Sequence, residues 1–242
     1  MITLFVIGFW LVVWEITSHV INNHILLVGP IATLTQLFYL AGTSLFWASI
    51  STSLVRVLTG FFLALGLGVG LAVLSYRYGW VYRLLLPLFH VMKAIPVASF
   101  VIIAIFWVGA SHLSVFISFV TVIPIIYFNT HKGLLETDKG LLEMAKVLKV
   151  SPYKKLKFIY TPAVIPYVTS GITTGFGFAW KSGIAAELIG TSRDTIGFNL
   201  HMARVFLQTA DLFAWTFTIV FLCFLIEQLF FMLFRRVHDS IS

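Results

Sequence analysis

Two short segments and a few isolated ionisable side chains are the places where this 242-residue chain could carry out chemistry. The first segment, residues 175–182, reads Gly-Phe-Gly-Phe-Ala-Trp-Lys-Ser, which comes close to a phosphate-binding P-loop. It departs from that pattern because Trp180 stands where the second glycine is required, and because it lies inside an apolar run rather than after a strand. We therefore expect no nucleotide site and no other cofactor in this chain.

Three ionisable side chains lie in or beside apolar runs, where an unpaired charge is costly. Lys181 follows a long uncharged run, Glu187 ends it, and Arg56 opens an earlier one. We take all three as candidates for lining a solute pathway, in which the two cations would favour an anion. The alternative for Lys181 is a structural ion pair, or extension of its ammonium group to the membrane surface. Glu15 and Glu227 are interpreted as partners for such bases or for other polar groups.

Clusters of side chains that catalyse reactions inside membranes are missing from the sequence pattern. No Asp lies within an apolar run, so an intramembrane protease or lipid transferase is not supported. His90, His112 and His131 lack the spacing of metal ligands, and the single Cys223 precludes a disulfide framework. Attraction to anionic lipid explains the net charge of +7 without a nucleic-acid partner.

The second segment, residues 132–157, gathers Lys, Asp and Glu in a chain that is otherwise mostly apolar. Apolar residues recur there among the charges at helical spacing. Ser151 followed by Pro152 is typical of a helix start, because Ser caps free N–H groups and Pro lacks one. We therefore predict two short helices joined by a tight turn and projecting into water. The residues expected to contact a partner are Leu141, Leu142, Glu143, Met144, Ala145, Lys149, Ser151 and Pro152.

The elements that must position these residues are membrane-spanning helices. Hydrophobic residues make up 60% of the chain and charged residues 10%. A water-soluble globular protein needs more charged residues than this to cover its surface. A single all-α domain of residues 1–242 is therefore predicted, a bundle of six helices long enough to cross about 30 Å of hydrocarbon. The predicted spans are residues 1–21, 57–76, 84–108, 113–130, 158–180 and 212–234. Residues 109–112 form a tight turn between the third and fourth, and residues 31–40 and 45–55 form short interfacial helices.

The distribution of Lys and Arg predicts the orientation. Most basic residues fall in the segment 132–157 and in the other connections on its side, including Arg77, Arg83, Lys93, Arg235 and Arg236. That side is therefore expected to be cytoplasmic, together with both termini, in a multi-pass membrane protein. The pairs Gly66/Gly70 and Gly171/Gly175, with Gly68 and Gly177, are expected to let helices approach closely. The alternative is that these thin helix faces line a solute path.

Residues 143–162 resemble the cytoplasmic signature loop of permease subunits of binding-protein-dependent ABC importers. That pattern is Glu-Ala-Ala, three residues, Gly, nine residues, Ile, one residue, Leu-Pro. Glu143, Ala145, Ile159 and Pro162 match it, whereas Met144, Lys149 and Thr161 depart from it. The flanking segments resemble, in order, the branch that handles nitrate, sulfonate and taurine; they are residues 53–57, 60–61, 93–96, 106–109 and 185–190.

The resemblance implies a type I importer permease whose loop 132–157 carries a coupling helix seated in a separate ATPase subunit, which would hold ATP and Mg²⁺. It also implies a second permease copy or close relative, an extracytoplasmic solute-binding protein and surrounding membrane lipid. The substrate is expected to be a small anion such as a sulfonate, taurine or nitrate. The alternatives are a vitamin precursor of the pyrimidine or thiamine type, or a stand-alone carrier. Since Lys adopts a left-handed conformation reluctantly, we expect a right-handed turn at Lys149 or a bend at a neighbour.

Overall fold

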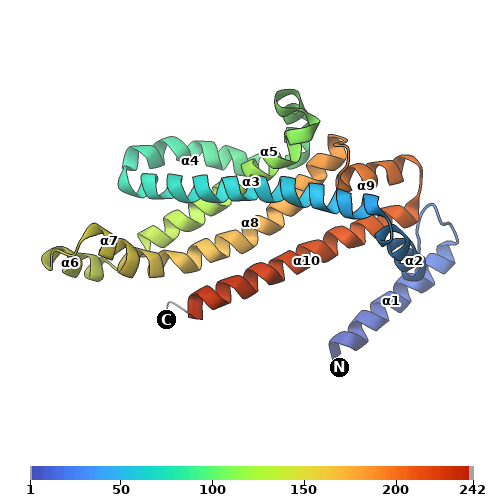
Figure 1. The fold of residues 1–242 in the computed structure, drawn as a ribbon, viewed down its shortest axis with the longest axis horizontal. Coiled ribbons are helices and arrows are strands. Elements are labelled where there is room, and N and C mark those ends of the chain that lie inside the picture. The colour runs from blue at the N-terminus through green and yellow to red at the C-terminus, as the bar shows by residue number, and fades with distance from the viewer. Residues whose placement is uncertain (1, 240–242) are drawn as a thin grey trace.

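The structure is a computed structural model that describes residues 2–239, with side chains described from Phe5 to Phe230 and at Met232. The described part is helical and contains no strand (Figure 1). Its elements are α1 (Ile2–Ile21), α2 (Pro30–Ala41), α3 (Ser44–Arg77), α4 (Gly79–Ala94), α5 (Val97–Leu135), α6 (Lys139–Val147), α7 (Pro152–Lys155), the π-helix η1 (Leu156–Tyr160), α8 (Thr161–Ile189), α9 (Ile196–Val205) and α10 (Thr209–Asp239).

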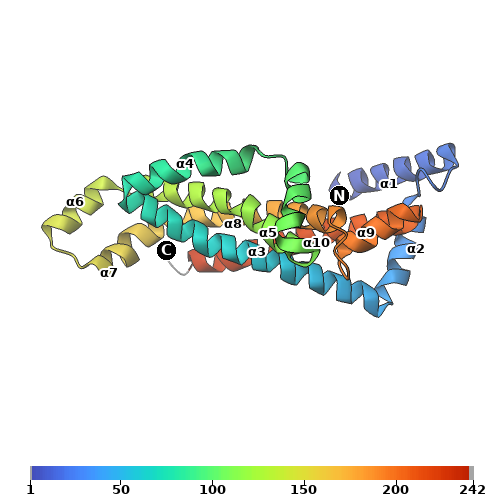
Figure 2. The ribbon, with the colours of Figure 1, turned by 90° about the horizontal axis from the view of Figure 1, so that it is seen from above.

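Three long helices form the centre of the bundle. α5 packs along both α3 and α8, and these helices run beside one another along the long axis of the molecule (Figures 1 and 2). The core between them is apolar and aromatic, with Phe61, Phe176 and Trp180 completely buried. A Cβ at Gly60 would lie 2.3 Å from the Val115 carbonyl oxygen, so this position needs glycine for α3 to approach α5.

The predicted glycine contacts are confirmed for only one of the two pairs. Side-chain atoms of α5 lie 3.2 Å from a Cβ placed at Gly171 and 3.3 Å from one placed at Gly175. Nothing lies within 4 Å of a Cβ placed at Gly66 or Gly70. Gly66 and Gly70 therefore make no close helix contact within this chain, because the spacing of small residues does not say which face of a helix meets its neighbour.

α3 is longer than the sequence predicts. It is one continuous helix of 34 residues, so residues 45–55 are its first turns and not a separate interfacial helix. Arg56 therefore lies inside the helix and does not open it. The break occurs earlier: Thr43 caps α3 by accepting a hydrogen bond from the N–H of Phe46, after α2 has ended at Ala41.

Residues 84–108 are not one helix, contrary to the prediction. α4 ends at Ala94 because Pro96 cannot continue the hydrogen-bond ladder, and the first arm of α5 (residues 97–108) turns away from the bundle axis (Figure 1). The chain then reverses at Gly109, which has φ +70° and ψ 166°, and α5 runs on to Leu135. The turn predicted at residues 109–112 is thus concentrated in one glycine, the residue type that adopts this conformation most readily.

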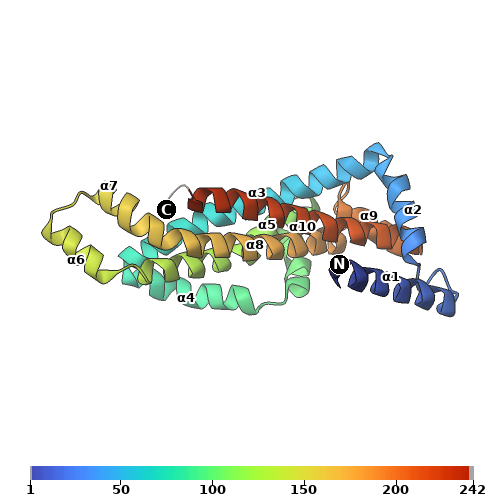
Figure 3. The same cartoon turned by 90° about the horizontal axis from the view of Figure 1, so that it is seen from below.

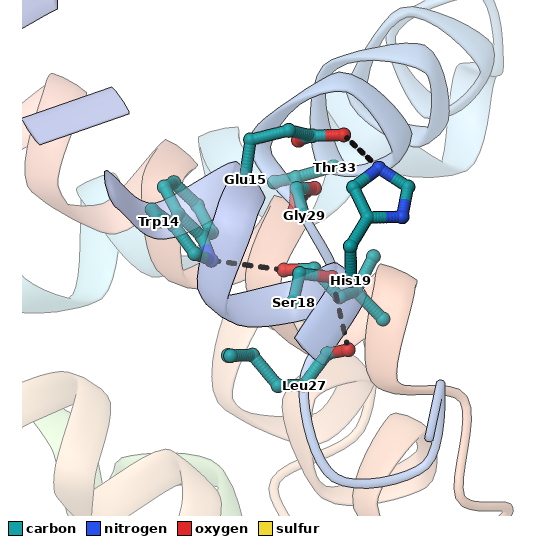
Figure 4. A network of polar contacts seen from close by, with 8 residues as sticks. Trp14, Glu15, Ser18, His19, Leu27, Gly29 and Thr33 are labelled. Carbon is teal, nitrogen blue, oxygen red and sulfur yellow. Dashed lines mark hydrogen bonds and ion pairs between the residues drawn. The ribbon is translucent and has the colours of Figure 1, made fainter. Parts of the chain in front are cut away.

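α1 and α2 meet in a polar hairpin (Figure 4). The Trp14 indole N–H donates to the Val28 carbonyl over 3.0 Å, and His19 Nε2 lies 3.2 Å from Glu15 Oε1. The other oxygen of Glu15 lies beside Gly29, immediately before the first turn of α2, where a carboxylate interacts favourably with the helix dipole. Glu15 therefore lies at the contact between α1 and α2, with this second oxygen buried and without a hydrogen-bond partner in the described residues.

By length and composition, three helices of the described part could cross a membrane: Ser44–Arg77, Val97–Leu135 and Thr209–Phe230. The count of six spans stays a prediction, as does the topology that depends on it. Met1 and the side chains of Arg235 and Arg236 lie outside the described residues.

Candidate functional site

The loop predicted to contact a partner forms two helices that project from one end of the bundle (Figures 1 and 3). We call this the loop end. α6 begins after Asp138, whose Oδ1 accepts hydrogen bonds from the N–H groups of Gly140 (2.7 Å) and Leu141 (3.3 Å). The cap satisfies backbone donors that the first turn leaves free, and its negative charge suits a helix N-terminus.

One side of α6 exposes an apolar stripe. The exposed fraction is 44% for Leu141, 54% for Met144, 80% for Val147 and 65% for Leu148. Their spacing of three or four residues places them on one side of the helix. We call these four residues the α6 stripe.

The other predicted contact residues of α6 are divided between surface and interior. Glu143 is exposed beside the α6 stripe, Leu142 is half-buried, and Ala145 is buried and faces the rest of the loop. Val147 and Leu148 were missing from the predicted contact set, although their apolar side chains at helical spacing were visible in the sequence.

Lys149 itself adopts the left-handed conformation, with φ +50°. The expectation of a right-handed turn or a bend at a neighbour is therefore wrong. The Val150 N–H bonds to the Ala145 carbonyl (2.9 Å) and the Lys149 N–H to the Lys146 carbonyl (3.2 Å). This pair of bonds defines a Schellman motif. The motif outweighs the steric cost of a side chain, so a backbone geometry that usually requires glycine is kept with lysine in its place.

The return helix starts as predicted. Ser151 caps α7 by accepting from the Lys154 N–H, and Pro152 occupies the first turn. The chain then passes through the π-helix η1 before α8, so one residue is inserted where the loop joins the bundle. At this junction Gly133 of α5 packs against the Tyr167 ring of α8, with 2.9 Å between that ring and a Cβ placed at Gly133. The two stems of the loop are thus held together.

Among the pathway candidates, Glu187 is completely buried at the opposite end of the bundle, which we call the α9 end. Its Oε2 accepts a hydrogen bond from the Ser53 hydroxyl (2.7 Å) and one from the Gly197 N–H (3.3 Å). Ser53 Oγ in turn accepts from the Ile196 N–H (2.9 Å). Glu187 therefore joins α8 to α3 and to the first turn of α9, and does not face open space in this chain.

Arg56 lies near Glu187 but makes no ion pair with it. The guanidinium and the Ser114 hydroxyl both act electrostatically on the Glu187 carboxylate. Within the described residues, Arg56 Nη1, Ser114 Oγ and Glu187 Oε1 are buried atoms without a hydrogen-bond partner. Because buried polar groups normally have partners, bound water is the expected partner of such atoms.

Lys181 is placed differently, on the exposed side of α8. The neighbouring Trp180 is buried, and its indole N–H donates to the Ile219 carbonyl of α10 over 2.9 Å. The segment that comes near a P-loop is therefore helix interior, packed against α10. No cluster of three His, Cys, Asp or Glu side chains occurs in the part of the chain that the structure describes.

Comparison with known proteins fits this arrangement. The sequence profile of the family described as "Binding-protein-dependent transport system inner membrane component" matches residues 63–239. A nitrate import permease protein from Synechocystis sp. is 30% identical over 189 residues, covering 74% of this chain and 68% of the relative.

Two further relatives are similar to this chain. A bicarbonate transport system permease protein from Synechococcus elongatus is 29% identical over 206 residues, 80% of this chain and 73% of the relative. A putative aliphatic sulfonates transport permease protein from Bacillus subtilis is 30% identical over 164 residues, 67% and 59%. With its all-helical bundle and projecting helical loop, the chain belongs to the membrane permease subunits of binding-protein-dependent ABC importers, in the branch of the nitrate, bicarbonate and sulfonate permeases.

Proposed function

We propose that this chain forms one half of the solute pathway of an ABC importer and that a separate ATPase subunit, which holds ATP and Mg²⁺, binds the α6 stripe. The observation that carries the proposal is the exposed apolar side of a helix at the tip of a charged loop. An apolar stripe in water is costly, and burying one side chain of this size contributes roughly 1.5–3 kcal/mol. A helix in a hydrophobic groove of a partner is a common way to recover that energy.

The construction of the loop supports a role in coupling. Its stems continue into α5 and α8, which pack along each other through the bundle (Figure 3). Movement of α6 by the ATPase would therefore be passed to two central helices together, as a rigid-body shift of packed elements. This chain would carry out no catalysis, since the energy comes from the partner.

The remaining assignments follow from the family and from charge. A second copy of the chain would supply the other half of the pathway, and a solute-binding protein would deliver the solute at the α9 end. The concentration of Lys and Arg at the loop end favours a cytoplasmic position for that end and for both termini, in a bacterial or archaeal plasma membrane. Lipid would cover the apolar outer surface.

The proposed substrate is a small anion such as nitrate, bicarbonate, taurine or another sulfonate. Three relatives are named as permeases for nitrate, bicarbonate and aliphatic sulfonates, and Lys181 offers a cation on an open helix side. An anion is therefore favoured over a vitamin precursor, because no residue of the described part indicates binding of a vitamin precursor.

The experiment is substitution of the α6 stripe in the importer reconstituted with its ATPase and binding protein. Met144→Ser with Val147→Ser and Leu148→Ser should abolish uptake and release the ATPase during purification, while the permease still inserts in the membrane. Met144→Leu is the matched control, because it keeps an apolar side chain of similar volume and should retain both properties. Normal uptake by the triple Ser variant would refute the proposed function.

A further inference from the structure

α8 has two faces of different chemistry. Its packed face is mostly glycine, alanine, isoleucine and aromatic residues, buried against α3, α5 and α10. Its open side includes Thr173 and the aromatic Phe178, both exposed. It also carries Ser170, Thr174 and Lys181, all exposed. Their positions, i, i+4 and i+11, lie within roughly 40° of one another around a helix and span about 16 Å along it. We call these three residues the α8 polar stripe.

Lipid is a poor neighbour for this face. α8 is 29 residues long and lies in the middle of the bundle, yet it is not among the described helices whose composition is apolar enough to cross a membrane. In hydrocarbon, hydroxyl and ammonium groups lose water that nothing replaces. A helix of this kind suits a position where one face packs on protein and the other meets water or a polar solute.

Lys181 also lacks a partner that would neutralise it. Within the described residues the only ion pair joins Glu15 and His19. The carboxylate of Glu227 on α10 is near, because its Oε1 lies 3.0 Å from a Cβ placed at Gly177, one turn of α8 before Lys181. Cys223, also on α10, has its Sγ 3.6 Å from the same oxygen. Glu227 therefore lies on the α10 side of α8 near Lys181 without forming an ion pair with it.

We propose that the α8 polar stripe is the surface along which a small oxyanion crosses the bundle, with hydroxyl contacts at Ser170 and Thr174 and an electrostatic contact at Lys181. The inference rests on the proposed function, since a second copy would supply the facing wall. Hydroxyl groups donate hydrogen bonds that replace part of the hydration of the anion. A cation that no ion pair holds attracts the anion, and conduction requires only a contact weak enough for release.

The first experiment measures access to the stripe and does not depend on transport. Cys223→Ala removes the single cysteine, after which Ser170→Cys or Thr174→Cys is introduced in the assembled importer. A negatively charged, water-soluble thiosulfonate should modify both at least tenfold faster than Thr59→Cys, the matched control on the exposed side of α3. Rates equal to that of the control would overturn the proposal, since they would mean that the stripe faces lipid or is covered.

The electrostatic contribution of Lys181 is tested in the same preparation. Lys181→Met should slow modification of Thr174→Cys by the anionic reagent about tenfold and leave the rate with a neutral thiosulfonate unchanged. Equal slowing of both reagents would show that Lys181 only shapes the packing, and would contradict the proposal. Protection of Thr174→Cys by nitrate or a sulfonate supports it, whereas protection by anionic lipid alone would assign Lys181 to a headgroup and refute it.

Uptake measurements then distinguish a failure of this inference from a failure of the proposed function on which it rests. Lys181→Met, and Ser170→Ala with Thr174→Val, should reduce anion uptake at least tenfold while the ATPase remains bound, and Lys181→Arg should retain most of it. A wild-type importer that binds no ATPase and takes up no anion would contradict the proposed function. Full uptake by the Lys181→Met variant of an active importer would overturn only the role of the α8 polar stripe.

Discussion

Glu187 organises the packing at the α9 end of the bundle. Its carboxylate accepts from Ser53 and from the N–H of Gly197, so the first turn of α9 is oriented toward a negative charge. The approach is so close that a Cβ at Gly197 would lie 2.4 Å from the Cβ of Glu187. Asn199 adds a hydrogen bond to Ser49 of α3 over 2.7 Å. These contacts give the buried carboxylate a structural role.

A substitution at Glu187 tests that role. Glu187→Ala removes the acceptor of two buried donors and should cost about 3–5 kcal/mol, the usual effect of breaking a buried charged contact. Glu187→Gln keeps an acceptor at the same position and should cost about 1–2 kcal/mol. The measurement is thermal unfolding of the purified permease in detergent. An unfolding temperature of Glu187→Ala equal to that of wild type would show that α9 is held by other contacts.

Single residues also mark the limit of what the sequence could predict. The type and place of Ser151 and Pro152 predicted the start of α7, because capping depends on neighbours in the chain. Lys149 misled the prediction because its left-handed conformation is imposed by two backbone hydrogen bonds of the turn, against the preference of the side chain. For Glu187 the sequence indicated an unusual buried charge but not its partners, which lie far away in the chain.

At the scale of elements, α4 is attached to the bundle by a narrow line of rings. Phe89 is its one buried residue, and its ring centre lies 4.5 Å from that of Tyr127 on α5. Nearer the loop end, Tyr82 stacks on His131 with ring centres 4.8 Å apart and an angle of 15°. The rest of α4 is largely exposed. α4 therefore joins the bundle through aromatic contacts on one side.

Loss of the central ring should loosen α4. Phe89→Ala is expected to cost about 2 kcal/mol, less than in a water-soluble core, because the freed helix face still lies in lipid. Hydrogen exchange of the α4 amides should accelerate roughly tenfold or more, with that of α8 unchanged. Leu88→Ala, at the exposed neighbour, is the control and should leave exchange as it is. Equal acceleration in α4 and α8 would mean that the bundle loosens as a whole.

The apolar runs predicted where helices occur better than where they break. Hydrophobicity indicates whether a residue is surrounded by water or by apolar groups, and not whether the helix continues. Residues 45–55 and 57–76 therefore could not be recognised as one helix that runs through Arg56. Pro96 and Gly109 were visible in the sequence as possible breaks. Whether the chain turns away at Pro96 or at Gly109 depends on whether the segment between them has a surface to pack on. Residues 97–108 pack in a small cluster of their own that includes Val101, Leu113 and Ala186.

At the scale of the whole molecule, the two ends of the bundle differ in chemistry. The loop end carries most of the basic residues and presents the α6 stripe, whereas the α9 end holds the network around Glu187 (Figures 1 and 2). At that end the Ser192 hydroxyl also donates to the Ala110 carbonyl over 2.6 Å, which ties the loop after α8 to the bend of α5. In the proposed coupling, a change at the loop end would have to reach the hydrogen-bond network around Glu187 at the α9 end.

This separation predicts opposite sides of the membrane for the two ends. In a Cys223→Ala background, Val147→Cys of α6 and Phe206→Cys after α9 place thiols on side chains that are 80% and 66% exposed. A membrane-impermeant thiol reagent should modify Phe206→Cys in intact cells and Val147→Cys only in inside-out vesicles, because positive residues are retained on the cytoplasmic side. Exchanged sides would mean that the importer is inverted and that the α6 stripe cannot meet a cytoplasmic ATPase. Modification of both from one side would mean that α8 does not cross the membrane, and that the six-span bundle is wrong.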